Sequence, residues 1–414
     1  MHELGRVLRL DARRTMILVA VPVLALLGIA AAWRELIPGV AYWDNTVVAI
    51  SASVRLLGPV AAALSAWVAV REHRLDYLRS LTPRSPATGP LVDLLLLGGV
   101  ALPAYGLVAL TIIIQTVLRA GTWELPPAGL LAGAAALALH VVLGYLAGRL
   151  IPNPLTVVAV AAATRLWDTL RGTGSSWLGL LPPAAIGQVG PFAELRPGLF
   201  ADQLLWSAGL SSALVLGYVL VVSRQVLLAV PLAAAVALTA AGTVRLHDYG
   251  GAAVAPAAAG YVCRDWPLTV CVHPALRDAL PDLEAAATPL AARLAGTEGG
   301  FTRVFQLPGG DPVAVRAGVA WTHLRDLAPG YERRAAREIR AGLADPDACT
   351  RPTPGRAYSA LVDAWLTDEP PPAVPDTAAG RRFARWSEQR RRSWLRAHYP
   401  GYRQCALAPA DFPR

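Results

Sequence analysis

Seven apolar segments dominate the first 244 residues and limit this chain to a small set of folds. The hydrocarbon core of a bilayer is about 30 Å thick, so a helix needs about 20 apolar residues to cross it. Only helices and closed barrels satisfy their backbone groups in lipid. We therefore predict an α-helical polytopic membrane protein with spans at about 16–33, 46–70, 91–118, 128–149, 155–170, 203–222 and 226–243.

The composition agrees with insertion into a membrane. Of 414 residues, 54% are hydrophobic and 16% are charged, whereas soluble domains average roughly 45–50% and 25%. All 38 basic residues are arginine, so the chain lacks the lysine that a P-loop ATP site requires. A net charge of +9 would suit a nucleic-acid binder. The arginines group by predicted membrane side, however, and we expect no nucleic-acid partner.

Short-loop arginines predict the orientation of the spans, because such residues concentrate in cytoplasmic loops. With a cytoplasmic N-terminus, four arginines lie in outer loops up to residue 202, at positions 34, 119, 171 and 196. Ten lie in inner segments, at positions 6, 9, 13, 14, 71, 74, 79, 84, 149 and 224. Seven spans then place everything after about residue 244 outside the cell membrane. The first segment also resembles a signal peptide, but its length favours an uncleaved helix.

All four cysteines lie in the predicted exterior part of the chain. An even set in an oxidising compartment indicates disulfide bonds, and four cysteines allow three pairings. We favour Cys263–Cys271, which brackets a plausible hairpin, together with Cys349–Cys405. A zinc site is less favoured, since ligand cysteines usually come in two close pairs. We expect no metal and no cofactor.

Residues 245–414 are predicted to form an extracytoplasmic α+β domain, separate from a transmembrane domain at 1–244. The stretch 381–399 carries seven arginines and is expected to be one amphipathic helix with an aromatic core face. The alternative is an arginine face that lies on anionic lipid headgroups. Short β-like pieces occur at 268–272, 302–307 and 313–316, and helical patterns at about 274–295, 331–344, 356–367 and 380–399.

The histidines of this domain belong to no HExxH motif, and no GxSxG elbow is present. His323 and Asp326 have helical i,i+3 spacing and could pair. An isolated pair of this kind is usually a structural contact, so we expect no enzymatic activity in this chain. A membrane-bound hydrolase is the least favoured alternative.

Ionisable residues within the predicted spans are costly unless they face the bundle, a partner or a wet cavity, and we single out four of them. Residues 172–202 are also unusual, because they are apolar and broken by proline and glycine. They suit a re-entrant or interfacial hairpin. An intramembrane polar path is therefore one interpretation of Arg55, His140, Arg165 and Asp168, with a local Arg165–Asp168 pair as the structural alternative.

The segment REHRLDYLRSLTPRSP at 71–86 is predicted to be a cytoplasmic loop between the second and third spans. Leu75, Leu78 and Leu81 are spaced by three, as on one side of a short helix. Thr82-Pro83 ends that helix, because proline disfavours helical backbone before it. A leucine stripe this thin needs another surface to rest on.

This loop resembles the first cytoplasmic loop of ABC-2-type transporter permease subunits in their actinobacterial form. There a glutamate and an arginine-rich start precede a leucine-containing helix, a Thr-Pro and an arginine. The matching residues here are Glu72, Arg74, Leu78, Thr82, Pro83 and Arg84. The resemblance covers about residues 1–222. The sequence departs from the family at Asp76-Tyr77, where Gly-Thr is common, in its seventh span and in its exterior domain.

The resemblance implies a six-span core and a loop that rests on a separate ATPase subunit. It also implies a second permease half, identical or different, and contact with membrane lipid. We therefore expect the permease subunit of an ABC exporter in the cell membrane. The alternative is a non-transporting membrane anchor whose exterior domain binds a ligand or peptide.

Overall fold

A computed structural model describes residues 2–73, 87–120, 126–171, 176–258, 260–350 and 353–413, except for the side chains of 2–18 and 120. The chain forms two compact units. Unit 1 comprises Met1–Leu36 and Ala41–Pro256, and unit 2 comprises Ile37–Val40 and Ala257–Arg414. The boundary therefore falls after Pro256, later than the expected 244/245.

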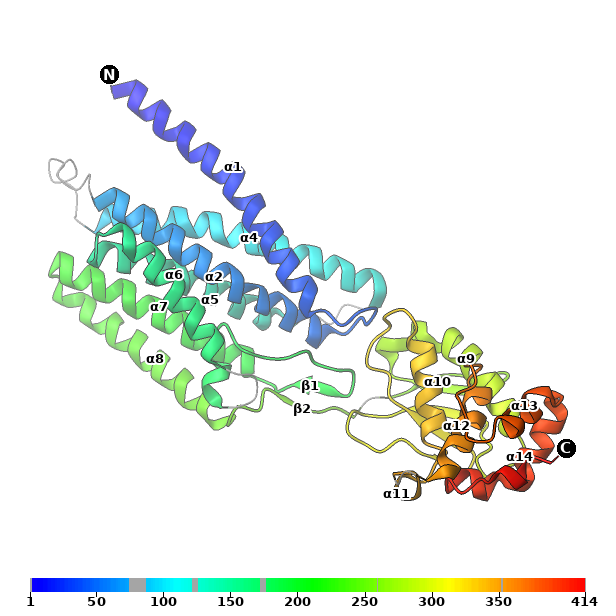
Figure 1. Cartoon of the computed structure of the whole chain (residues 1–414). Helices are drawn as coiled ribbons and strands as arrows, with labels where there is room; N and C mark the ends of the chain where they lie inside the picture. Colours follow the sequence, from blue (N-terminus) through cyan, green and yellow to red (C-terminus); the bar gives the residue numbers. More distant parts are fainter. Residues whose placement is uncertain are drawn as a thin grey trace. The chain divides into compact units, whose positions relative to one another are not determined.

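Unit 1 is a bundle of long helices, and every predicted span corresponds to one of them (Figure 1). Five of these helices are long and apolar enough to cross a membrane, as a helical membrane protein requires. α6 has only 17 residues, or about 25 Å of helix. The helices are α1 (His2–Glu35), α2 (Trp43–His73), α4 (Thr88–Ala120), α5 (Pro127–Leu150), α6 (Pro154–Leu170), α7 (Leu199–Ser223) and α8 (Ala229–Asp248).

α7 and α8 form a tight hairpin, which agrees with the short gap between the spans predicted at 203–222 and 226–243. α7 ends at Ser223, and Arg224 adopts a left-handed backbone with a φ of 56°. A short 3-10 turn, η2 (Val226–Leu228), then leads into α8. Only a few residues therefore reverse the chain between two long apolar helices.

The tightest helix packing in unit 1 joins α2 to α5, and it depends on small residues. A methyl group on Gly144 of α5 would overlap the carbonyl oxygen of Ala62, and one on Gly148 would overlap that of Ala66. Such close backbone approach is the main source of helix association in lipid, where apolar burial contributes little. α2 is also the most buried of the candidate spans. The bundle is therefore organised around α2.

Replacing Gly144 with leucine should separate α2 from α5. Overpacked cores lose roughly 1–3 kcal/mol, and here the clash is with backbone, so we expect a loss at the upper end of that range. Gly106→Leu is the matched control, since nothing lies within 4 Å of a Cβ on this α4 glycine. Thermal unfolding in detergent measures both. Equal melting temperatures for the two variants would contradict this packing.

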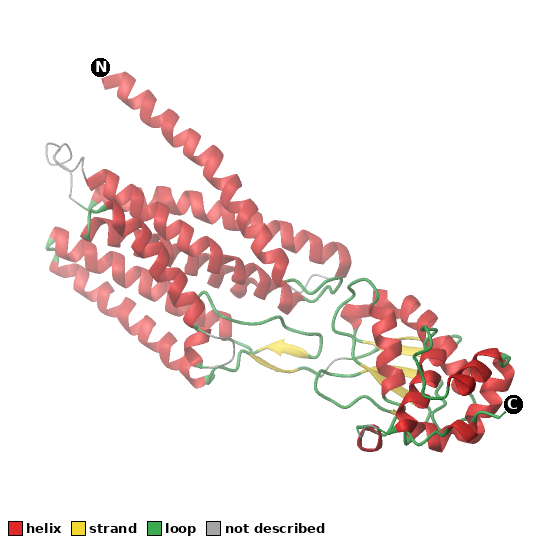
Figure 2. Ribbon diagram, viewed as in Figure 1, coloured by secondary structure: helices red, strands yellow, loops and turns green. Residues whose placement is uncertain are grey.

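Unit 2 contains one five-stranded sheet covered by helices (Figure 2). The strand order is β3-β4-β5-β7-β6, in which β4, β5 and β7 run parallel. Val270, Val304 and Ala320 are in register across the three parallel strands and are fully buried. The strands are β3 (Val262–Arg264), β4 (Thr269–Val272), β5 (Arg303–Gln306), β6 (Val315–Arg316) and β7 (Val319–Thr322).

Two helices of unit 2, η3 and α9, come between β4 and β5, and the others follow the sheet, which agrees with the expected α+β class. The structure also contains the β3 and β7 strands, which the hydropathy pattern did not indicate. The helices are η3 (Pro274–Ala279), α9 (Leu280–Leu294), α10 (Tyr331–Ala341), α11 (Pro346–Cys349), α12 (Pro354–Leu366), α13 (Thr377–Arg385), α14 (Glu388–Arg403) and η4 (Pro409–Asp411).

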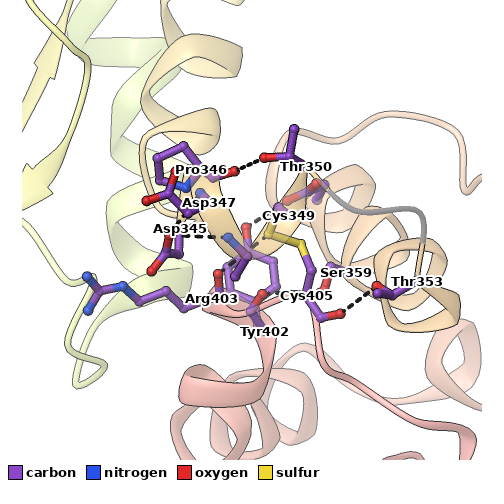
Figure 3. The surroundings of a disulfide bond; sticks show 12 residues. Asp345, Pro346, Asp347, Cys349, Thr350, Thr353, Ser359, Tyr402, Arg403 and Cys405 are labelled. Carbon is purple, nitrogen blue, oxygen red and sulfur yellow. Dashed lines mark hydrogen bonds between the residues drawn. A yellow bond between two sulfur atoms is a disulfide. The ribbon is translucent and has the colours of Figure 1, made fainter.

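Unit 2 contains two disulfides, in the pairing favoured from the sequence. Cys263 and Cys271 face each other across β3 and β4. Cys349 of α11 is bonded to Cys405, just after α14 (Figure 3). Asp345 caps α11 and donates its N–H to the carbonyl of Arg403 at 2.8 Å, which holds the same two segments together.

The arginine-rich stretch 381–399 is two helices, so the prediction of one continuous helix is wrong. The chain breaks at Trp386–Ser387, where the Ser387 hydroxyl accepts the N–H of Arg390 and caps α14. Phe383, Trp386 and Trp394 still form the expected aromatic core, with ring centroids 5.5–5.8 Å apart. The cap competes with helix continuation because a serine at this position satisfies a free N–H.

Glu388 follows this break and joins three helices. Its carboxylate accepts from Trp365 Nε1 at 2.9 Å and pairs with Arg293 and Arg392, each at 3.3 Å. Burial raises the pKa of Glu388, but the Trp365 hydrogen bond and the attraction of Arg293 outweigh it. The pKa is lowered overall.

The stability of unit 2 should therefore depend on the charge of Glu388. A carboxylate whose pKa is lowered by folding stabilises the fold at pH values above its unfolded pKa of about 4.3. That stabilisation is lost as the pH falls through the pKa of the folded state. Unit 2 of the wild-type chain should be more stable than that of Glu388→Gln at neutral pH, and this difference in stability should disappear as the pH falls below about 4.3. Hydrogen exchange of α9 and α14 at pH 3–7 measures the difference. A difference that does not change with pH would contradict the role of this charge.

Candidate functional site

Three of the four ionisable residues predicted at membrane depth come together in unit 1, and Arg171 joins them. Asp168 Oδ1 pairs with Arg171 Nη2 at 2.6 Å, and both side chains are almost completely buried, at 0% and 3% exposed. Arg55 Nη2 donates to the backbone carbonyl of Asp168 at 3.3 Å. Asp168 also lies close enough to His140 to interact with it electrostatically. We call Arg55, His140, Asp168 and Arg171 the polar cluster.

α6 turns Asp168 towards the interior of the bundle, whereas most of its apolar residues are exposed. Of its residues, all of which the structure describes, only Thr156 and Asp168 are buried. Its leucines are exposed instead, with Leu155 and Leu170 each 73% exposed. A helix that turns apolar side chains outward and a carboxylate inward suits a lipid environment, where charge must face the protein interior.

His140 contributes a buried ring from α5. Its Nδ1 lies 2.8 Å from the carbonyl oxygen of Ala136, and since a carbonyl can only accept, Nδ1 carries the proton. The ring packs directly on Gly58, where an added Cβ would come within 2.7 Å of Cδ2. The glycine in α2 therefore creates the space that His140 occupies.

Arg165 is not part of this cluster, and the local Arg165–Asp168 pair is wrong. Arg165 is exposed on the outer face of α6. Asp168 instead pairs with Arg171, three residues towards the C-terminus. Arg171 has the same i,i+3 spacing from Asp168, but the span predicted at 155–170 ends before it, so the sequence places Arg171 in an outer loop rather than at the end of the helix.

A non-helical segment lies next to the polar cluster, and we call residues 177–195 the strap. It contains one 3-10 turn, η1 (Trp177–Leu180), and a short strand, β1 (Ala193–Leu195), paired antiparallel with β2 (Val254–Pro256). Its middle is buried continuously from Gly179 to Ile186. The segment predicted as a re-entrant or interfacial hairpin is thus irregular chain that the helices bury.

Polar side chains from the helices bind the backbone of the strap. Arg171 donates to the carbonyls of Leu181 and Pro183, the latter at 3.1 Å. Gln203 Nε2 of α7 donates to the carbonyl of Leu180 at 2.9 Å. Irregular backbone at membrane depth is tolerated only where the protein satisfies it in this way. Arg171 thus connects the strap to the carboxylate of α6.

The start of α2 holds the second half of the strap. Asn45 Oδ1 accepts the N–H of Val189 at 3.2 Å, and Asp44 Oδ2 accepts that of Leu195 at 2.8 Å. The hydroxyl of Tyr42 donates to the carbonyl of Ala193 at 2.6 Å. The strap is therefore tied to α2 as well as to α6 and α7.

The polar cluster has unused hydrogen-bonding capacity. Among the described residues, Asp168 Oδ2 and Arg55 Nε are buried and have no hydrogen-bond partner. Two guanidinium groups face one carboxylate and a histidine. This arrangement can bind a polar or charged group that supplies both a donor and an acceptor.

Most of the predicted coupling loop lies outside the described residues, namely Arg74, Leu75, Leu78, Leu81, Thr82, Pro83 and Arg84. Glu72 lies in the last turn of α2.

His323 in unit 2 pairs with Glu338, so the predicted His323–Asp326 pair is wrong. His323 Nδ1 and Glu338 Oε1 are 2.7 Å apart, while Asp326 pairs with Arg334 at 2.6 Å. His323 follows β7 directly and is not helical, which removes the basis of the i,i+3 argument. Glu338 lies on α10, fifteen positions along the chain, and only the fold brings it near. In the described parts of the chain, no three His, Cys, Asp or Glu side chains are grouped to hold a metal.

Removing the charge of Arg171 should destabilise unit 1 far more than removing that of Arg165. Arg171→Gln leaves Asp168 buried without its partner, which typically costs about 3–5 kcal/mol. Arg165→Gln changes an exposed position and should stay within about 0.5 kcal/mol of wild type. Thermal unfolding in detergent and hydrogen exchange of residues 177–189 measure these effects. Equal effects of both changes would contradict a structural role for the Arg171 pair.

Comparison with known proteins gives no match: no family model, no curated protein and no solved structure matches this chain. Its function is therefore argued from the polar cluster, the strap and the loop sequence. The polar cluster is unusual for a purely structural bundle, because it brings charged groups into the part of the chain expected to lie in lipid.

Proposed function

We propose that this chain is the membrane-embedded permease subunit of an exporter driven by a separate ATPase chain. The observation that carries the proposal is the polar cluster, in which Arg55, Asp168 and Arg171 are brought together inside a bundle of apolar helices. Ionisable groups at such positions are expensive and usually mark a substrate or ion pathway. The unsatisfied atoms of Asp168 and Arg55 support a binding role for this cluster.

The sequence of residues 71–86 supports the ATPase-driven part of the proposal. Its match to the ABC-2-type coupling loop and the absence of lysine from the chain agree with a power source on another subunit. The arginine distribution supports a cytoplasmic N-terminus, and the two disulfides support an exterior location for unit 2. In this arrangement the loop faces the ATPase and the strap lies towards the outside.

α2 supplies a physical connection between the loop and the polar cluster. Glu72 and Arg55 lie on this one continuous helix, about 25 Å apart at 1.5 Å per residue. A push at one end of a helix can move its other end, and alternating access commonly uses rigid-body movements of this kind. Closure of the ATPase would move α2 against α5 and α6 and so open or close the cluster.

The loop is tested by co-purification from native membranes. A Leu78→Asp, Leu81→Asp variant should lose the ATPase chain by more than roughly tenfold, because a buried leucine contributes about 1.5–3 kcal/mol. The matched control is Gln225→Asp, in the turn between α7 and α8 on the same predicted side. An unaffected double variant would contradict the docking role of the loop. Wild-type protein that never carries an ATPase would contradict the permease proposal itself.

A membrane anchor with a binding domain is the second candidate, and the His323–Glu338 pair favours it. Thr322 Oγ1 and the N–H of His323 both donate to Glu338, at 2.7 and 2.6 Å, which orients the imidazole. Among the described residues, His323 Nε2 has no partner. Retained ATPase association after deletion of 257–414 would favour the permease. A loss of every activity without loss of assembly would favour the anchor.

A further inference from the structure

The break between α13 and α14 gathers arginines at one corner of unit 2. Arg381 and Arg385 lie one turn apart on α13, and Arg390 and Arg391 lie in the first turn of α14. Arg381, Arg385 and Arg390 are exposed, and Arg391 is half-buried. We call these four residues the arginine cluster.

Two members of the arginine cluster are held in place by the aromatic core beneath them. Arg391 donates from Nε to the carbonyl of Phe383 at 3.0 Å and from Nη2 to that of Ala384 at 2.7 Å. Its guanidinium therefore lies at the end of α13, next to Arg385. The Arg390 guanidinium lies 4.7 Å from the ring centre of Trp386. Groups held in this way lose less side-chain entropy when they bind a ligand.

The positive charge of this region is not neutralised within unit 2. Between residues 376 and 404 the chain has eight arginines and two acids, a balance of 8 − 2 = +6. Both acids are already engaged, Glu388 by Arg293 and Arg392, and Asp376 by Arg382 at 3.7 Å. Within the described chain, Arg381, Arg385 and Arg391 form no ion pair with a carboxylate. Their charge is therefore available to an anionic partner.

We propose that the arginine cluster binds the phosphate headgroups of anionic lipids in the bilayer that holds unit 1. Guanidinium groups match phosphate oxygens with paired, charge-assisted hydrogen bonds. Eight residues separate the end of α8 at Asp248 from the start of unit 2 at Ala257, and the last three of them form β2 of unit 1. A tether of this length keeps the lipid surface at a high effective concentration, which a free polyanion does not have. The inference is independent of whether the chain transports anything.

The test uses the full chain in nanodiscs of phosphatidylcholine alone or mixed with phosphatidylglycerol. Hydrogen exchange of residues 377–392 should slow several-fold in the anionic discs, and high salt should abolish the difference because it screens exposed charges. Arg381→Gln with Arg385→Gln should abolish it as well. These two residues donate to no backbone carbonyl in the described structure, whereas Arg391 caps α13 and is left unchanged.

Arg333→Gln with Arg337→Gln is the matched control, an exposed pair with the same spacing on α10. It should keep the lipid-dependent protection. Equal exchange in both kinds of disc would overturn the proposal, as would an equal loss in the control variant. Protection by soluble polyphosphate without protection by anionic discs would also overturn it and would identify a soluble polyanion as the partner.

Discussion

The buried pair between Asp168 and Arg171 is the interaction on which the membrane unit depends. A charge inside an apolar bundle needs an opposite charge and hydrogen-bond partners to offset the loss of water. Arg171 meets this condition by binding Asp168 and two strap carbonyls together. The pair therefore lets irregular chain enter the bundle, and it fixes the end of α6 to that chain.

α2 explains how the rest of unit 1 is arranged around this pair. Its small residues allow α5 to pack closely against it, and Gly58 leaves space for the His140 ring. Asp44 and Asn45 in its first turn accept hydrogen bonds from the strap backbone. Because one helix contacts the cluster, the strap and α5, a movement of α2 affects all three. In unit 2 the aromatic core has a comparable role, since it positions both the Glu388 contacts and the arginine cluster.

Much of the helical architecture could be predicted from hydropathy, because a span must be apolar over a length set by the bilayer. The two disulfides could be predicted because all four cysteines lie at one end of the chain and because the spacing of Cys263 and Cys271 suits a hairpin. The course of the strap and the β7 strand could not be predicted in the same way. Short strands and irregular segments carry too few residues for a periodic signal, and their stability comes from partners far away in the sequence.

The sequence by itself determined the apolar helices, the two-part organisation and the residues that are costly in lipid. The tertiary structure alone decided which of those residues meet. Asp168 had arginines at both i−3 and i+3, and sequence spacing cannot distinguish them. The packing of α6 turned Arg165 outward and brought the strap to Arg171, so burial and hydrogen bonding selected the second partner. His323 likewise met Glu338 because β7 and α10 pack together, although fifteen positions separate the two residues.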